Sequence, residues 1–111
     1  MSLLTGDVVW ADLGAPRGRE QAGRRPAVVV SSNQYLDAVD TLALIVPVTS
    51  RDRGWPNHVL LTGDLRLHVP SFAMTEQPRA VARERIVGNA GSIDEACLRQ
   101  IRFVLRAFLD L

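Results

Sequence analysis

Two continuous runs of apolar residues constrain the fold of this chain more than any other feature of its sequence. Residues 26–31 contain three consecutive valines, and residues 42–48 read Leu-Ala-Leu-Ile-Val-Pro-Val. Unbroken apolar runs of this length, rich in β-branched side chains, are typical of strands buried inside a sheet. Because Pro47 has no N–H to donate to a neighbouring strand, we expect it at a sheet edge or at the end of its strand.

Shorter segments around these runs predict further strands and turns. β-Branched and aromatic residues predict strands at 7–13, 57–62, 71–76 and 80–87. Glycine and polar residues predict loops at 14–23 and 49–56, a turn at Gly63-Asp64 and a break in the chain at 88–91. Residues 33–40 have helical spacing over one or two turns. The sequence therefore predicts five or six short strands before residue 92.

Residues 93–109 predict one amphipathic helix. Ser92 is a suitable N-cap, and Glu95 three residues later completes a capping box. One stripe of the helix is apolar, formed by Cys97, Ile101, Val104, Leu105 and Phe108, and another face carries Arg99, Arg102 and Arg106. Several short strands followed by one helix favour a mainly β fold, namely a small barrel or strongly curved sheet with the helix packed on it.

Composition limits the class of protein. A chain of 111 residues with 47% hydrophobic and 23% charged residues fits one folded domain over residues 1–111. No stretch approaches eighteen uncharged apolar residues, so we expect no membrane span. The N-terminus lacks the basic start and apolar block of a secretory signal. Because Cys97 is the single cysteine, no internal disulfide can form, and we expect a reducing, cytoplasmic compartment.

The positive charge is carried entirely by arginine. The net charge is +1, and all 13 cationic side chains are arginine. One interpretation of this bias is GC-rich codon usage, and the functional alternative is that arginine suits bidentate phosphate contacts; composition alone does not separate the two. Arginines gather in two segments, 17–25 and 79–85. A nearly neutral protein with two basic clusters is suited to binding an anion on one face.

Most recognised catalytic patterns are missing from the sequence. The possible metal ligands Cys97, His58 and His68 form no zinc-binding spacing, so we expect no metal and place Cys97 in the core. There is no nucleophile elbow and no glycine-rich phosphate loop, so we expect no nucleotide cofactor. The two histidines are isolated in the sequence; either could assist a reaction, but a lone histidine near a strand is more often structural or solvated.

One pairing of strand ends remains as a candidate site. Arg24 and Arg25 precede the first apolar strand, and Thr49 and Ser50 follow the second. If these strands are neighbours, guanidinium groups and hydroxyls share one edge of the sheet. Arginine can hold a phosphate and stabilise charge that develops on it. The alternative is that the arginines are solvated and that Thr49 and Ser50 start a turn.

Five segments of the chain resemble the MazF/PemK family of toxins. They are Gly-Asp-Val-Val-Trp-Ala-Asp-Leu at 6–13, Gly-Arg-Glu-Gln-Ala-Gly-Arg-Arg-Pro-Ala-Val-Val-Val-Ser at 18–31, Val-Pro-Val-Thr-Ser at 46–50, Pro-Asn-His-Val-Leu-Leu at 56–61 and Met-Thr-Glu-Gln at 74–77. Their order and separation cover essentially the whole chain. The resemblance implies an SH3-like barrel of five to seven strands with a C-terminal helix, the Kid/MazF/CcdB-type toxin fold, in a homodimer.

The resemblance also implies a sequence-specific endoribonuclease that cleaves single-stranded RNA without a metal. Arg25 and Thr49 fall on the family's catalytic pair. In the implied reaction the RNA 2′-hydroxyl attacks its own 3′-phosphate, leaving a 2′,3′-cyclic phosphate and a 5′-hydroxyl. The remaining expected RNA-binding or supporting residues are Arg17, Arg19, Glu20, Gln21, Arg24, Ser50, Trp55, Gln77 and Arg79. For Trp55, packing within its loop is as good an interpretation as base stacking.

The resemblance further implies a cognate antitoxin. Such antitoxins carry an acidic C-terminal segment that folds on binding, and the basic edge of Arg17, Arg19, Arg24, Arg25 and Arg79 is the complementary surface. An alternative from another class is a non-catalytic CcdB-like toxin, or a nucleic-acid-binding barrel that acts on a protein target, because fold alone does not determine function.

Overall fold

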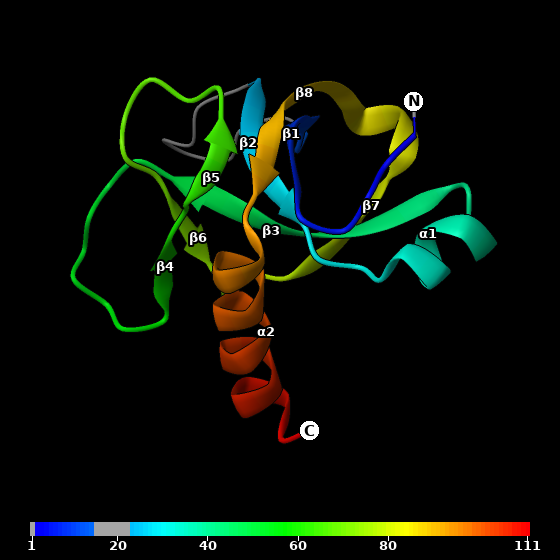
Figure 1. Ribbon diagram of the computed structural model, residues 1–111. Helices are drawn as coiled ribbons and strands as arrows, with labels where there is room; N and C mark the ends of the chain where they lie inside the picture. The colour runs from blue at the N-terminus through cyan, green and yellow to red at the C-terminus, as the bar shows by residue number, and fades with distance from the viewer. Residues whose placement is uncertain (1, 15–22) are drawn as a thin grey trace.

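The computed structural model describes residues 2–14 and 23–111, and within them eight strands form one antiparallel sheet with a helix at the C-terminal end (Figure 1). The strands are β1 (Asp7–Asp12), β2 (Arg24–Val29), β3 (Leu42–Thr49), β4 (His58–Leu60), β5 (Gly63–Leu65), β6 (Phe72–Met74), β7 (Arg79–Ala82) and β8 (Ile86–Ile93). The helices are α1 (Asn33–Ala38), a 3₁₀ turn at Arg83–Arg85, and α2 (Glu95–Leu109). The expected fold class is confirmed, with more strands than the sequence indicated.

The sheet curls into a small barrel. Its strand order is β4-β6-β3-β2-β1-β8-β5, and β7 pairs separately with β3. The two ends of this order, β4 and β5, are separated in the chain only by Leu61 and Thr62. The carbonyl of Thr62 accepts a hydrogen bond from the Asp94 N–H, directly after β8, at 2.9 Å. Residues 58–65 therefore join the two edges of the sheet.

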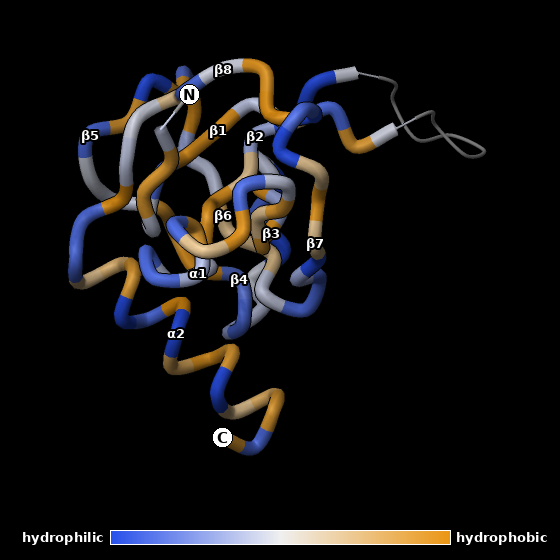
Figure 2. Tube along the Cα trace, turned by 90° about the vertical axis from the view of Figure 1, so that its right-hand side faces the viewer, coloured by the Kyte–Doolittle hydropathy of each residue, from blue (hydrophilic) through white to orange (hydrophobic). Residues whose placement is uncertain are grey.

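Apolar clusters cover both faces of the central strands. One cluster includes Val8, Val28 and Val46 and continues into α2 through Cys97 and Ile101. The second cluster, on the other face, joins alternate residues of the same strands to α1 and β7, including Val9, Val29, Leu36, Ile45 and Val81. Figure 2 shows hydrophobic residues concentrated where β1, β2 and β3 cross the centre. The continuous apolar runs thus mark strands with two buried faces, as predicted.

Pro47 does not lie at a sheet edge, and this part of the prediction is wrong. β3 pairs with β2 on one side, while on its other side it pairs with β7 through residues 42–45 and with β6 through residues 48–49. The carbonyl of Leu44 faces β2, where it accepts from the Val30 N–H. Backbone groups alternate in direction along a strand, so the nitrogen of Pro47 faces the opposite side. On that side Pro47 lies between the part of β3 that pairs with β7 and the part that pairs with β6, so no partner strand needs an N–H from this position.

Two glycine-rich segments predicted as a turn and a chain break are strands instead. Gly63-Asp64 lies in β5, and residues 88–91 lie within β8, which pairs with β5. Gly63 and Gly91 have φ angles of +134° and +111°, and a methyl group on Gly91 would lie 2.0 Å from the Asp64 carbonyl oxygen. These glycines therefore allow close approach of two backbones rather than ending the strands.

The N-cap of α2 is Asp94, not Ser92. Asp94 Oδ1 accepts a hydrogen bond from the Cys97 N–H at 2.8 Å, whereas Ser92 lies in β8 opposite Asp7 and Asp64. The apolar stripe is buried at Cys97 and Ile101, but Phe108 is 54% exposed because the second half of α2 extends beyond the sheet (Figure 1). The buried position of Cys97 agrees with the predicted core role.

The predicted strand at 80–87 is divided by the 3₁₀ turn. Arg83 lies in this turn, and its guanidinium donates to the carbonyl of Val39 at 3.0 Å, to that of Leu42 at 3.1 Å and to that of Leu36. These three carbonyls belong to the end of α1 and the start of β3. Through these hydrogen bonds Arg83 links the connection between β7 and β8 to the connection between α1 and β3.

Candidate active site

A hollow of about 360 Å³ lies where β2 begins and β3 ends. It is lined by Trp10, Arg24, Arg25, Pro26, Val48, Thr49, Ser50, Leu67, His68, Val69 and Ser71. The four residues that the sequence places at these two strand ends, Arg24, Arg25, Thr49 and Ser50, therefore line one surface. Their proximity follows from the antiparallel pairing of β2 with β3.

The register of β2 and β3 explains how Arg25 and Thr49 come together. The last paired residues are Ala27 and Pro47. The ladder stops there because Pro26 has no N–H to donate. Arg25 and Thr49 lie just beyond this last pair, one near the start of β2 and the other at the end of β3, and both line the hollow.

The polar groups of the hollow are mainly hydrogen-bond donors. Thr49 Oγ1 accepts a hydrogen bond from the Arg51 N–H at 3.1 Å, which leaves the hydroxyl hydrogen of Thr49 free to donate elsewhere. Arg25 is half-buried, and Arg24 is exposed. Among the described residues that line the hollow there is no carboxylate. A site with guanidinium and hydroxyl donors and no described negative charge suits a phosphate group.

The segment after β5 also lines the hollow, through Leu67, His68 and Val69. This segment is held at both ends: Arg66 donates to Asn89 Oδ1 at 2.6 Å, and the Ser71 carbonyl accepts a hydrogen bond from the Leu61 N–H at 2.9 Å. His68 is exposed and lines the same hollow as the predicted pair. No spacing pattern in the sequence points to this position, because His68 lies 19 positions after Thr49 and only the fold of the barrel brings them to one hollow.

The other predicted RNA-contacting residues lie elsewhere or outside the described part of the chain. Trp55, Gln77 and Arg79 do not line this hollow; Arg79 begins β7, opposite Ile45 of β3. Arg17, Arg19, Glu20 and Gln21 lie outside the described residues.

A buried histidine, His58, pairs with the exposed Glu76, which the sequence did not indicate. His58 is 9% exposed, and its Nε2 lies 3.1 Å from both carboxylate oxygens of Glu76. Burial raises the pKa of Glu76, but hydrogen bonds, chiefly the one with His58, outweigh it, so the pKa of this carboxyl lies below its ordinary value. β4 and β6 bring the two residues together, because His58 pairs with Met74 two residues before Glu76.

Trp55 packs against this pair. Its ring centroid lies 4.8 Å from that of His58, and the Arg53 guanidinium carbon lies 5.5 Å from the Trp55 ring. The side chain is nevertheless 49% exposed. Packing within the loop is therefore present, and one part of the ring stays open to solvent.

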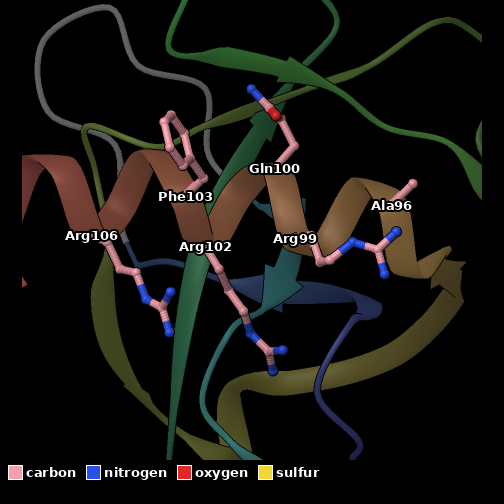
Figure 3. A pocket seen from close by; sticks show the side chains of 6 residues that line it. All are labelled: Ala96, Arg99, Gln100, Arg102, Phe103 and Arg106. Atoms are coloured by element: carbon pink, nitrogen blue, oxygen red, sulfur yellow. The ribbon is translucent and has the colours of Figure 1, made fainter.

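A second hollow, of about 520 Å³, lies on the outer side of α2. Figure 3 shows Arg99, Arg102 and Arg106 along one side of the helix and Gln100 and Phe103 along another. Phe103 is 68% exposed. This face carries the arginines predicted from the helical spacing, and it is separate from the hollow that contains Arg25.

No group of three or more potential metal ligands was found among residues 2–14 and 23–111. Burial raises the pKa of the Cys97 thiol, which favours its protonated form over a metal-binding thiolate. Across the same described ranges, no helix has the length and apolar character needed to cross a membrane.

Comparison with known proteins identifies relatives over nearly the whole chain. Residues 4–109 match the family described as PemK-like, MazF-like toxin of type II toxin–antitoxin system. The endoribonuclease toxin MazF of Escherichia coli strain K12 is 36% identical over 98 residues, which cover 87% of this chain and 85% of that protein. Endoribonuclease MazF9 of Mycobacterium tuberculosis is 36% identical over 112 residues, covering 96% and 95%.

Solved structures have the same fold. The MazE–MazF complex of Deinococcus radiodurans contains a chain that superposes with a TM-score of 0.83 at 29% identity, covering 100% of this chain and 98% of that one. MazF from the same organism superposes with a TM-score of 0.81 at 29% identity, covering 100% and 99%.

Proposed function

This chain belongs to the PemK-like, MazF-like toxins of type II toxin–antitoxin systems, and from that premise we propose that it cleaves single-stranded RNA without a metal, through Arg25 and Thr49. It is the endoribonuclease toxin of such a pair, as relatives 36% identical over most of its length are endoribonucleases by name. The observation that carries the assignment to these residues is their common position on one donor-rich hollow.

The reaction fits the groups that line the hollow. The RNA 2′-hydroxyl attacks the adjacent 3′-phosphate, which gives a 2′,3′-cyclic phosphate and a free 5′-hydroxyl. A metal is not required, because the nucleophile is already part of the substrate. Arg25 stabilises the charge that builds up on the phosphorane, and the free hydroxyl hydrogen of Thr49 holds a non-bridging oxygen.

Incubation of the purified protein with RNA in EDTA tests this function. We expect cleavage with cyclic-phosphate ends in wild type, and a fall on the order of 100-fold or more in Arg25→Ala. Arg106→Ala serves as the control for loss of an arginine, because Arg106 lies on the outer side of α2. Loss of wild-type cleavage under chelation would contradict the mechanism, and full activity of Arg25→Ala would remove this residue from the site. DNA damage in expressing cells with intact RNA would favour a CcdB-like toxin.

Recognition of the RNA sequence involves residues around the cleavage site. The proposed RNA-binding or supporting residues are Arg17, Arg19, Glu20, Gln21, Arg24, Ser50, Trp55, Gln77 and Arg79. The exposed part of the Trp55 ring offers a stacking surface for an unpaired base. Sequencing the ends produced from a mixed RNA pool defines the cleavage motif. If Trp55 stacks on a base, Trp55→Ala alters the preferred bases; an unchanged motif would assign Trp55 to loop packing alone.

The partner of the toxin is proposed to be an antitoxin with an acidic C-terminal segment. The Deinococcus relative is a MazF in complex with MazE. An acidic segment along Arg17, Arg19, Arg24, Arg25 and Arg79 competes with RNA phosphates. Electrostatic contacts weaken as salt rises, so Arg17→Ala combined with Arg19→Ala lowers the affinity for the antitoxin peptide and its dependence on salt. Unchanged affinity and salt slope would exclude this edge as the binding surface.

We also propose that the chain acts as a cytoplasmic homodimer and that residues 1–111 form one domain. Exposed apolar side chains on the projecting half of α2, among them Phe103, Phe108 and Leu109, are a large unpaired surface for a chain of this size. A two-fold dimer would duplicate the basic hollow. Sedimentation at micromolar concentration gives a dimer mass if this is correct, and a monomer mass if it is not.

A further inference from the structure

The proposed reaction needs a group that accepts a proton, and neither Arg25 nor Thr49 supplies one readily. The 2′-hydroxyl must lose its proton as it attacks phosphorus. Arginine stays protonated in proteins and has no acceptor. Thr49 Oγ1 already accepts a hydrogen bond from the Arg51 N–H. The pair therefore accounts for stabilising the phosphate but leaves the proton without a destination.

His68 is the side chain in the hollow suited to this task. Among the described residues that line the hollow, the ionisable side chains are Arg24, Arg25 and His68. A neutral imidazole has one nitrogen that accepts a proton, and histidine is the residue that changes charge between pH 5 and 8. His68 is exposed, so substrate RNA can reach its ring. His68 lines the same hollow as Arg25 and Thr49.

We propose that His68 is the general base of the RNA cleavage reaction, an inference that rests on the proposed function. Neutral His68 takes the proton from the 2′-hydroxyl while the 2′-oxygen forms its bond to phosphorus. The bond from phosphorus to the 5′-oxygen breaks, the 5′-oxygen takes a proton from water, and the His68 imidazolium returns its proton to water. Atoms and charge balance without any further reactant.

The surroundings of His68 define what a pH profile reports. The charged groups that line the hollow with it are Arg24 and Arg25 from β2. The neutral polar groups are Thr49 at the end of β3, Ser50 directly after it, and Ser71 from the same segment as His68. Arginine does not titrate in the accessible pH range. A fall of the cleavage rate at low pH, the acid limb of the profile, therefore reports protonation of the group that accepts the proton. Glu20 lies outside the described residues and is the competing acceptor, so its variant belongs in the same experiment.

The test measures single-turnover cleavage of an RNA oligonucleotide, carrying one mapped site, in EDTA between pH 5 and 8. The wild-type cleavage rate rises with pH across this interval, because only the unprotonated base accepts the 2′-hydroxyl proton. His68→Ala and His68→Gln lose on the order of 100-fold at pH 7 and lose this acid limb. Added imidazole restores cleavage in His68→Ala but not in Arg25→Ala. Melting temperatures near wild type show that the exposed substitution leaves the fold intact.

The outcomes separate this inference from the proposed function. If wild type cleaves in EDTA but His68→Ala stays within threefold of it across the pH range, His68 is not the base while the endoribonuclease stands. If His68→Ala loses activity but keeps the acid limb and imidazole does not restore cleavage, the proton acceptor lies elsewhere. Loss of the limb in Glu20→Gln alone assigns the base to Glu20. Failure of wild type to cleave in EDTA contradicts the proposed function itself.

Discussion

Replacement of Gly91 by alanine tests the close approach of β5 and β8 that closes the barrel. Gly91 has φ +111°, and an added methyl group would lie 2.0 Å from the Asp64 carbonyl oxygen and 3.0 Å from Leu65 Cα. Both contacts are with backbone, which cannot rotate away as a side chain can. The two strands must separate, and the segment that carries His68 follows β5 directly.

The expected loss follows from two contributions. Backbone strain at a positive φ costs about 1–3 kcal/mol. Separation of β5 from β8 weakens sheet hydrogen bonds worth about 1 kcal/mol each. We expect Gly91→Ala to lose about 4 kcal/mol of unfolding free energy. For a domain of this size, this lowers the melting temperature by about 15 °C.

Gly54→Ala is the matched control. Gly54 also has a positive φ, +69°, but an added methyl group meets no atom within 4 Å. It therefore carries strain without overlap, and we expect a loss of about 1–2 kcal/mol. Thermal unfolding followed by circular dichroism compares the two variants. Melting of Gly91→Ala within about 5 °C of Gly54→Ala would refute the close approach of the two strands.

Three further predictions concern the site and its supports. Thr49→Val should lower the single-turnover rate of RNA cleavage on the order of 100-fold without a change in melting temperature, whereas Thr49→Ser retains most activity. An active valine variant would show that the hydroxyl takes no part in the mechanism. Arg83→Ala should lower the free energy of unfolding in urea by about 1–3 kcal/mol, more than Arg85→Ala does, because Arg83 donates hydrogen bonds to three carbonyls. Equal losses in the two variants would contradict the proposal that Arg83 links the two connections. The pKa of Glu76 is lower in the folded protein than its ordinary value of 4.5. The pair with His58 therefore adds about 1 kcal/mol to the free energy of unfolding at pH values above 4.5, and this contribution is lost as the pH falls through the pKa of Glu76 in the folded protein. Glu76→Gln should therefore differ most from wild type at pH 7 and least near pH 3, and a constant difference would contradict the lowered pKa.

The strands with two buried faces were predictable because their own residues carry the signal. Val28 and Ile45 lie in unbroken apolar runs. Successive residues of a strand point to opposite faces of the sheet, so such a run is removed from water only when both faces are covered. The glycines of β5 and β8 were misread because local propensity treats glycine as a breaker. Gly63 and Gly91 must be glycine because the backbone of a distant segment approaches each of them closely. The residues next to them in the sequence carry no information about this approach.

The candidate site was predictable where it depends on neighbouring strands and not where it depends on closure of the barrel. Arg25 and Thr49 end the two recognisable strands, and antiparallel pairing of these strands is enough to bring them together. His68 reaches the same hollow only because the segment after β5 crosses to it. The His58–Glu76 pair likewise depends on the register of β4 against β6, two strands of three residues each whose pairing is not encoded in their composition.

The central claim is that the RNA supplies the nucleophile and that the protein supplies charge and proton transfer without a metal. The most direct measurement uses two oligonucleotides that carry the mapped cleavage site and differ only in the 2′-hydroxyl at the cleaved position, incubated with wild-type protein in EDTA. The account predicts that the all-ribose strand is cut to a 2′,3′-cyclic phosphate while the 2′-deoxy strand stays intact and competes for binding. Cleavage of the 2′-deoxy strand would contradict it.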